Sequence, residues 1–287
     1  MLNRRRVSII VATYNRGELL CENAESLLAQ EYDSYEIIYV DDGSTDDSPS
    51  VLEALQDTHS GRLRVLRVEN GGPGPARNAG AEAATGELLL ITDDDTIAPS
   101  DWVEKMVSLY EASDCEVVSG GFRPFSMENR IERYLHHRMC VIFGDEAKEI
   151  HAAPMMSFMI SKEHFAESGG FCDRRLPWGE DWELCLRMGD RGWVMRYDPS
   201  VWIVHHYQTK WEPAALRIRE AGATGIYIRR LGKGWTGAYT IYSVLRFLMS
   251  PLWILRRYPL DLYFLALRME AVFCGARVKA YLSGAGK

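Results

Sequence analysis

The sequence predicts an α/β fold with a mostly parallel central sheet flanked by helices. Two observations support this class. Apolar, β-branched runs alternate with helix-spaced segments over the first 120 residues, and polar stretches, two of them rich in aspartate, directly follow three of the apolar runs. Such alternation is typical of parallel strands joined by crossover helices. A third observation, the apolar and aromatic texture beyond Trp211, predicts a C-terminal helical extension.

The expected elements follow from the local patterns. Strands are expected at Val7–Thr13, Glu36–Val40, Leu63–Val68, Leu88–Thr92, Glu116–Gly120, Trp193–Tyr197 and Val201–His205. Helices are expected at Glu18–Gln30, Gly74–Ala84, Pro99–Tyr110 and Glu180–Asp190. A further helix is expected to begin near Ser44 or Thr45. The stretch from His151 predicts a strand and then a helix, whereas residues 121–150 give no clear pattern.

Composition excludes a disordered chain and favours the cytoplasm. The 287 residues are 47% hydrophobic and 25% charged, which is ordinary for a globular protein. Six scattered cysteines lack zinc-ligand spacing and fit a reducing compartment. The apolar run Val7–Thr13 is too short for a secretory signal and indicates a buried first strand.

Three polar groups are expected to share one cleft. In open parallel sheets, ligands bind at the carboxyl ends of the strands. Thr13–Asn15, Asp41–Asp42 and Asp93–Asp95 each follow an apolar strand directly. Asp93, Asp94 and Asp95 could together face a hard cation and a diphosphate, since Mg²⁺ and Mn²⁺ prefer oxygen ligands. The alternative for this triplet is a solvated acidic turn or a helix cap.

Two further motifs suggest nucleotide contacts. In VDDGSTDD, Asp42 could accept a hydrogen bond from a base N–H, although a turn and a capped helix explain the same residues. In GGPGPARNAG, Arg77 could meet a phosphate, and the alternative is a loop with one surface arginine.

The last two motifs suggest a base and a further metal ligand. Glu180 and Asp181 follow Trp178 and Gly179 at a helix start, where acids either complement the helix dipole or act as a general base. His205 and His206 end an apolar strand, and either could complete a metal site or serve a structural role.

Taken together and in this order, these motifs resemble the family 2 glycosyltransferases with the GT-A fold. The matching pieces span roughly residues 6–206: VSIIVATYNR, the helix end at Gln30, EIIYVDDGSTDD, GGPGPARNAG, LLLITDDDT, GGF at 169–171, WGEDWELCLR and VWIVHH. The resemblance implies a catalytic domain over residues 1–210, with a nucleotide-sugar half to about residue 120 and an acceptor half from 121 to 210. Residues 211–287 form the extension.

The resemblance also implies an inverting transfer from a UDP-, GDP- or dTDP-linked sugar, with Mn²⁺ or Mg²⁺ as cofactor. The Asp-x-Asp motif of the family corresponds to Asp93 and Asp95. The resemblance implies nucleotide binding by Thr13, Asn15, Asp42, Arg77, Asp93 and Asp94. It implies metal binding by Asp95 together with His205 or His206. It further implies base catalysis by Asp181, supported by Glu180, and an acceptor or sugar pocket at Trp178 and Gly179.

Two rival functions are weaker on the residues present. A sugar-nucleotide pyrophosphorylase shares the fold but carries a glycine-rich, basic loop after the first strand, where this chain has ATYNRGELL. A non-catalytic nucleotide-sugar or glycan-binding module would be favoured if Asp95 or Asp181 were missing, and both are present.

The C-terminal segment predicts a surface partner. From His206 onward there are 13 Lys and Arg against 4 Asp and Glu. The residues before His206 contain 20 Lys and Arg and 36 Asp and Glu. Ala238–Leu255 and Leu260–Ala276 are apolar but carry internal charges, which are costly at a bilayer centre. We therefore expect helices lying at an anionic membrane face rather than spans or nucleic-acid contacts. That expectation implies a peripheral enzyme at the cytoplasmic face with a lipid-linked or cell-envelope glycan acceptor. The alternative is a subdomain packed on the core or at a homodimer contact.

Overall fold

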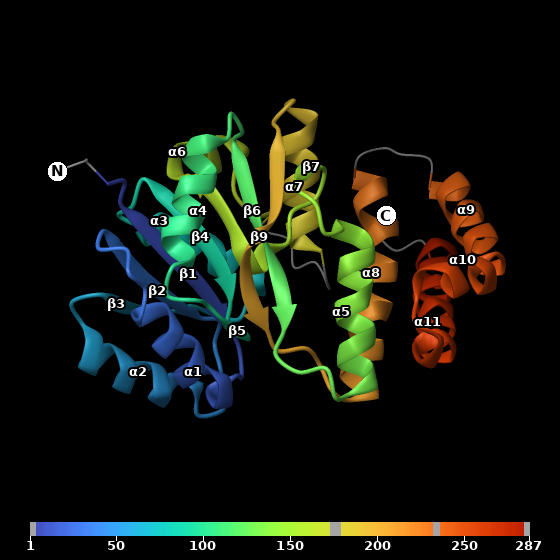
Figure 1. Ribbon diagram of the computed structural model, residues 1–287, viewed down its shortest axis with the longest axis horizontal. Helices are drawn as coiled ribbons and strands as arrows, with labels where there is room; N and C mark the ends of the chain where they lie inside the picture. Colours follow the sequence, from blue (N-terminus) through green and yellow to red (C-terminus); the bar gives the residue numbers. More distant parts are fainter. Residues whose placement is uncertain (1–3, 173–178, 232–235, 284–287) are drawn as a thin grey trace. The chain divides into compact units, whose positions relative to one another are not determined.

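The computed structural model describes residues 4–172, 179–231 and 236–283 (Figure 1). The chain divides into two compact units. The first unit comprises Met1–Arg123, Asp145–Arg175 and Glu180–His206, and the second comprises Pro124–Gly144, Leu176–Gly179 and Tyr207–Lys287.

The first unit is organised around a mixed sheet with the strand order β3-β2-β1-β4-β8-β6-β9-β5, and β7 pairs with β9. Four strands form a parallel half: β1 Val7–Thr13, β2 Tyr35–Asp41, β3 Leu63–Arg67 and β4 Leu88–Asp93. Strands β1, β2 and β4 are almost wholly buried, which explains their continuous apolar runs. The predicted α/β class is confirmed.

The other strands extend the sheet beyond β4. They are β5 Thr96–Ile97, β6 Val117–Pro124, β7 Lys148–Ile150, β8 Phe158–Ser161 and β9 Met195–His205. Strand β8 runs antiparallel to β4 and to β6, and β9 runs antiparallel to β5 and to β7. The pairing of β5 with β9 places Thr96 opposite His205, so the end of β9 returns to the aspartate-rich turn.

Helices flank this sheet (Figure 1). They are α1 Gly17–Leu28, α2 Ser48–His59, α3 Pro73–Ala83, α4 Trp102–Ala112, α6 Lys162–Ser168 and α7 Glu180–Asp190, with a 3₁₀ turn η1 at Met155–Ser157. Helix α3 packs on β1 and β2, and Gly80 makes this approach possible. A Cβ atom at Gly80 would lie 2.6 Å from Cγ2 of Ile10.

Some predicted boundaries were wrong, for tertiary reasons. Helix α2 begins at Ser48 rather than at Ser44 or Thr45, because Oδ1 of Asn15 accepts hydrogen bonds from the amides of Thr45 and Asp46. Those amides are therefore held in a loop, and Asp46 accepts from the amide of Ser48 where the helix starts. Helix α4 likewise begins at Trp102 and not at Pro99.

The two strands expected near the end of the first unit are one strand, β9. Asp198, Pro199 and Ser200, which lie between the two expected strands, belong to β9, and glycines of β6 let the chain pass closely there. A Cβ atom at Gly121 would lie 2.7 Å from Cα of Pro199. The neighbouring strand therefore accommodates the proline, which sequence periodicity cannot show.

The second unit is helical, which confirms the predicted C-terminal helices. It contains α5 Arg130–Phe143, α8 Trp211–Leu231, α9 Thr236–Leu248, α10 Ser250–Arg257 and α11 Tyr263–Leu282, with a 3₁₀ turn η2 at Leu260–Leu262. Tyr134, Tyr207, Ile254 and Met269 lie in its core. Helix α5 joins this unit although its sequence showed no clear pattern. Among the described helices, none combines the length and the apolar character that crossing a membrane requires.

A buried amide ties helix α1 to the end of β4. The side-chain nitrogen of Asn23 donates to the carbonyls of Asp93 and Thr96, and its oxygen accepts from the Tyr39 hydroxyl. Asn23 is 1% exposed, so water cannot replace these partners.

We predict that Asn23→Ala lowers the free energy of unfolding by about 2–4 kcal/mol, because it leaves several buried polar groups unsatisfied. Chemical denaturation at neutral pH measures the loss. Glu25→Ala, at an exposed position of the same helix, is the matched control and should change stability by less than about 0.5 kcal/mol. Equal stability of the two variants would show that this amide does not anchor the turn.

Candidate functional site

The carboxyl ends of three strands meet at one edge of the sheet. Thr13 pairs with Asp41 between β1 and β2, and Ala12 pairs with Asp93 between β1 and β4. Asn15 adopts a left-handed backbone with φ 53°, a conformation that asparagine tolerates better than most residues. The three predicted polar groups therefore follow strands that end side by side.

Asp42 anchors the loop that precedes α3. Its carboxylate accepts hydrogen bonds from the amides of Gly71 (2.8 Å) and Gly72 (2.9 Å), and its carbonyl accepts from the Asn70 side chain. Gly72 has φ 97°, which favours glycine at this turn. Asp42 is thus a buried loop anchor, and its contact with a nucleotide base stays a prediction.

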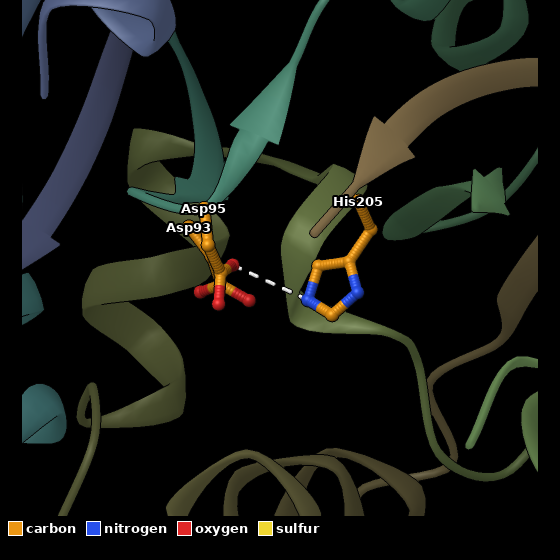
Figure 2. Close-up of side chains that lie close together, drawn as sticks. All are labelled: Asp93, Asp95 and His205. Carbon is orange, nitrogen blue, oxygen red and sulfur yellow. Dashed lines mark ion pairs between the residues drawn. The ribbon is translucent and has the colours of Figure 1, made fainter. Parts of the chain in front are cut away.

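Asp93, Asp95 and His205 converge at the end of β4 (Figure 2). One ligand atom from each lies within 4.8 Å of the others. Nε2 of His205 is 3.2 Å from Oδ1 of Asp95, and both side chains are 4% exposed. The pairing of β5 with β9 produces this meeting, because it places His205 opposite the residue after Asp95. Two carboxylates and an imidazole fit a divalent cation such as Mn²⁺ or Mg²⁺.

The two adjacent histidines occupy different surroundings. His205 belongs to the converging cluster, whereas Nε2 of His206 lies 3.2 Å from Oε2 of Glu22 on α1. The amide of His206 also donates to the carbonyl of Asp95, which fixes the strand end against the turn. The structure therefore brings His205 into the cluster and turns His206 toward helix α1.

Asp94 lies between the two carboxylates of the cluster in sequence and is itself buried. Burial, and next the negative charge of Asp95, raise the pKa of Asp94 to about 7, although Arg16 and Thr13 oppose that rise. The guanidinium of Arg16 lies 3.6 Å from Oδ2 of Asp95. The sequence interpretation gave Arg16 no role, although it directly follows the strand-end group Thr13–Asn15.

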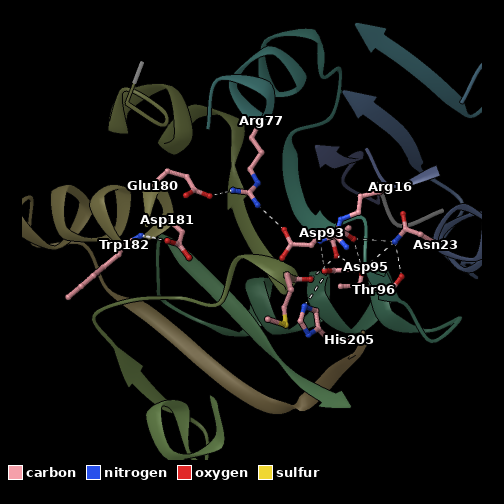
Figure 3. Close-up of polar contacts among 12 residues, drawn as sticks. Arg16, Asn23, Arg77, Asp93, Asp95, Thr96, Glu180, Asp181, Trp182 and His205 are labelled. Atoms are coloured by element: carbon pink, nitrogen blue, oxygen red, sulfur yellow. Dashed lines mark hydrogen bonds and ion pairs between the residues drawn. The ribbon is translucent and has the colours of Figure 1, made fainter. Parts of the chain in front are cut away.

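Arg77 connects the cluster to helix α7 (Figure 3). Nη2 donates to Oδ1 of Asp93 at 2.8 Å, and Nη1 donates to Oε1 of Glu180 at 2.7 Å. Burial by itself would lower the pKa of Arg77, but the charges of Asp93 and Glu180 raise it above its ordinary value. Arg77 is thus a buried bridge between two carboxylates, and a contact with nucleotide stays a prediction.

Asp181 sits in the first turn of α7, next to Glu180. Burial raises its pKa to about 7, the charge of Glu180 adds to the rise, and Arg77 opposes it. A carboxyl group that titrates near neutral pH is suited to general base catalysis. Figure 3 shows Asp181 on the α7 side of Arg77, with the Asp93–Asp95–His205 cluster on the other side. Gly179 is buried with φ 90°, and Trp178 lies outside the described residues.

The sequence matches known proteins over its first part. The profile of Glycosyl transferase family 2 matches residues 8–172. Glycosyltransferase GlyG of Streptococcus pneumoniae serotype 4 is 39% identical over 117 residues, which are 40% of this chain and 38% of GlyG. A glucosyl-dolichyl phosphate glucuronosyltransferase of Haloferax volcanii is 30% identical over 175 residues, which are 58% of this chain and 56% of that protein. The chain thus spans less than two thirds of the length of these relatives.

The fold matches a solved structure over nearly its full length. Mannosyltransferase PcManGT from Pyrobaculum calidifontis, solved in complex with GDP-Man and Mn²⁺, superposes with a TM-score of 0.71 at 20% identity. The match covers 98% of this chain and 88% of that chain, and it confirms the predicted GT-A type of fold. Because the family match covers more than half of the 287 residues, the chain belongs to glycosyl transferase family 2.

Proposed function

We propose that this chain transfers a sugar, with inversion, from a nucleotide-sugar donor to an acceptor hydroxyl, with Mn²⁺ or Mg²⁺ bound. The observation that carries this proposal is the convergence of Asp93 with the buried side chains of Asp95 and His205 at the strand ends. Family membership supports the class of reaction, and Arg77 links that cluster to Glu180, the neighbour of the candidate base Asp181. The family match also favours transfer over nucleotide-sugar binding without catalysis and over pyrophosphorylase activity.

The proposed donor site uses the residues at the strand ends. PcManGT holds GDP-Man and Mn²⁺, which supports a nucleoside diphosphate sugar and a divalent cation for a chain of the same fold. Thr13, Asn15 and Asp42 would line the base pocket of a UDP-, GDP- or dTDP-linked donor. Asp94 would contact the nucleotide beside Asp93.

Asp93, Asp95 and His205 would hold the cation, and Arg77 keeps Asp93 oriented toward it. The cation, when bound, neutralises the negative charge that grows on the departing nucleoside diphosphate. The residues fit this task because the two carboxylates and the imidazole are already gathered, with Asp95 and His205 buried and Asp93 partly exposed.

Asp181 is the proposed base that removes the proton of the acceptor hydroxyl. Glu180 would support it indirectly, since its carboxylate is engaged by Arg77. An inverting displacement needs base and leaving group on opposite sides of the anomeric carbon. The strand-end cluster and the start of α7 come from different elements, and we propose that they would flank the anomeric carbon on these two sides. Trp178 and Gly179 precede this helix and are proposed to line the acceptor or sugar pocket.

The proposed acceptor is a glycan or a glycolipid. The Haloferax volcanii relative is named for a glucosyl-dolichyl phosphate substrate, which supports a lipid-linked acceptor in envelope glycan assembly. The free cysteines fit the reducing cytoplasm, where nucleotide sugars are available. We therefore propose a cytoplasmic protein that works at the inner face of a membrane.

The metal site yields the first test. We predict that Asp95→Ala weakens the Mn²⁺-dependent binding of a nucleoside diphosphate by at least about tenfold, because the cation loses a buried carboxylate ligand. Titration calorimetry with and without Mn²⁺ measures the change. Asp101→Ala removes a surface carboxylate that pairs with Lys105 and is the matched control. Wild-type affinity in the Asp95 variant would remove Asp95 from the site.

The base assignment yields the second test. We predict that Asp181→Asn binds donor normally but lowers kcat by about 10²–10⁴-fold, the usual effect of losing a general base. The amide keeps the shape of the side chain and one acceptor oxygen. Transfer to a glycan or lipid-linked acceptor is measured beside Asp190→Asn, the same change at an exposed position of the same helix. Turnover of the Asp181 variant close to that of the control would refute the assignment.

The pH profile yields the third test. Asp181 must lose its proton to act as a base, so kcat/KM should rise with pH and level off above a pKa of about 7. A bound cation lowers that pKa, so the inflection should lie at or below 7 with Mn²⁺. Removing the Glu180 charge also lowers it, because that charge contributes to the rise. Glu180→Gln should therefore shift the rising limb to lower pH, and a shift to higher pH would contradict this electrostatic account.

A further inference from the structure

The second unit carries an unusually exposed apolar face. Large hydrophobic side chains are more than half exposed along four successive elements, and we call this set the apolar face: Ile241 63%, Tyr242 60%, Leu245 56%, Leu248 66%, Met249 57%, Leu252 61%, Leu255 52%, Leu260 76% and Phe264 77%. They belong to α9, α10, η2 and the start of α11, with Met249 at the junction of α9 and α10. Large apolar side chains exposed together on neighbouring elements indicate an interaction site.

The apolar face is distinct from the side on which these helices pack together. On α9, Ile241, Leu245 and Leu248 are spaced by four and three residues, so they share one side of the helix. On α10, Leu252 and Leu255 are exposed, whereas Ile254 is 1% exposed in the core of the second unit. Helix α10 therefore has one apolar side that is covered by its own unit and another that faces solvent.

Basic side chains adjoin the apolar face. Arg256 and Arg257 are exposed and directly follow Leu255 at the end of α10. The two acidic residues of this stretch are engaged elsewhere, since Asp261 pairs with Arg133 at 2.6 Å and Glu270 pairs with Arg246 at 3.0 Å. From residue 240 to 283 the chain has six basic residues and these two acidic ones. The face thus combines exposed hydrophobic side chains with a positive margin.

We propose that the apolar face is a docking surface for an anionic lipid bilayer. Apolar side chains beside arginines suit a helix lying at the boundary between headgroups and acyl chains, where anionic lipid attracts the basic residues. Exposed Tyr242 and partly buried Trp253 and Tyr263 are residue types that favour headgroup depth. Helices that dock in this way lie in the plane of the membrane surface.

Charge argues against a second copy of this chain as the occupant. In a twofold-symmetric dimer the same patch meets itself. The positive margin at Arg256 and Arg257 would then face a second positive margin, and the chain from His206 onward is basic by nine charges, 13 minus 4. An anionic membrane supplies the opposite charge over the whole face. This proposal concerns the second unit alone, and it can hold or fail independently of glycosyl transfer.

Vesicle flotation with the full chain tests the proposal. We expect the protein to float with phosphatidylserine-containing vesicles at low salt, to stay behind with pure phosphatidylcholine, and to lose most binding as salt screens the arginines. Arg256→Gln/Arg257→Gln should weaken binding at low salt by at least about tenfold. Arg219→Gln, an exposed arginine on α8 of the same unit, should float like the wild type.

The hydrophobic contribution is tested by Leu252→Ser/Leu255→Ser, which should also weaken vesicle binding at least about tenfold. Leu216→Ser is the matched control, because Leu216 is 47% exposed on α8 and lies outside the apolar face. Circular dichroism and Mn²⁺-dependent nucleotide binding establish that each variant is folded. The proposal is overturned if the wild type ignores anionic vesicles or if both double variants float as the wild type does. It is also overturned if the leucine variant converts a dimer to a monomer in size-exclusion chromatography without affecting flotation.

Discussion

A buried guanidinium determines how the candidate site is assembled. Arg77 projects from α3 and pairs with Asp93 at the end of β4 and with Glu180 at the start of α7. Without these two carboxylates, Arg77 would carry an unpaired charge in a buried position, which is costly. The arginine therefore holds the end of β4, which carries the proposed cation ligands, against the start of α7, which carries the proposed base. Asn78, next to it, holds the segment at Phe171 through two hydrogen bonds.

The same concentration of charge explains the unusual titration of the site. Burial raises the pKa of both Asp94 and Asp181 to about 7, with the neighbouring carboxylates Asp95 and Glu180 as the next cause in each case. A carboxyl group whose pKa is higher in the folded than in the unfolded protein stabilises the fold when it is protonated. Its contribution to the free energy of unfolding therefore declines as pH rises from the pKa of the unfolded state to about 7. A divalent cation between Asp93 and Asp95 would offset this repulsion.

The local sequence was sufficient to predict a structural feature wherever that feature depends on residues that are close together in the chain. The apolar strands, the helix spacing and the turn residues depend on near neighbours, and the strand-end rule then selected Thr13, Asp42 and the Asp93–Asp95 triplet. Local signals failed where a distant partner decides. The start of α2 is delayed by the side chain of Asn15, and β9 continues through Pro199 because Gly121 makes room for it. The sequence of residues 121–150 showed no clear pattern, and helix α5 within it packs with residues that lie more than 60 positions further along the chain.

The sequence by itself therefore determined the α/β class, the family resemblance and the set of acidic residues at the strand ends, since all of these are properties of residue type and order. Only the tertiary structure decided which of them meet. Antiparallel pairing of β5 with β9 selects His205 for the cluster and turns His206 toward Glu22. Packing against the core divides α10 into a covered side and an exposed one. Such choices depend on contacts between segments far apart in the chain, which residue order alone does not specify.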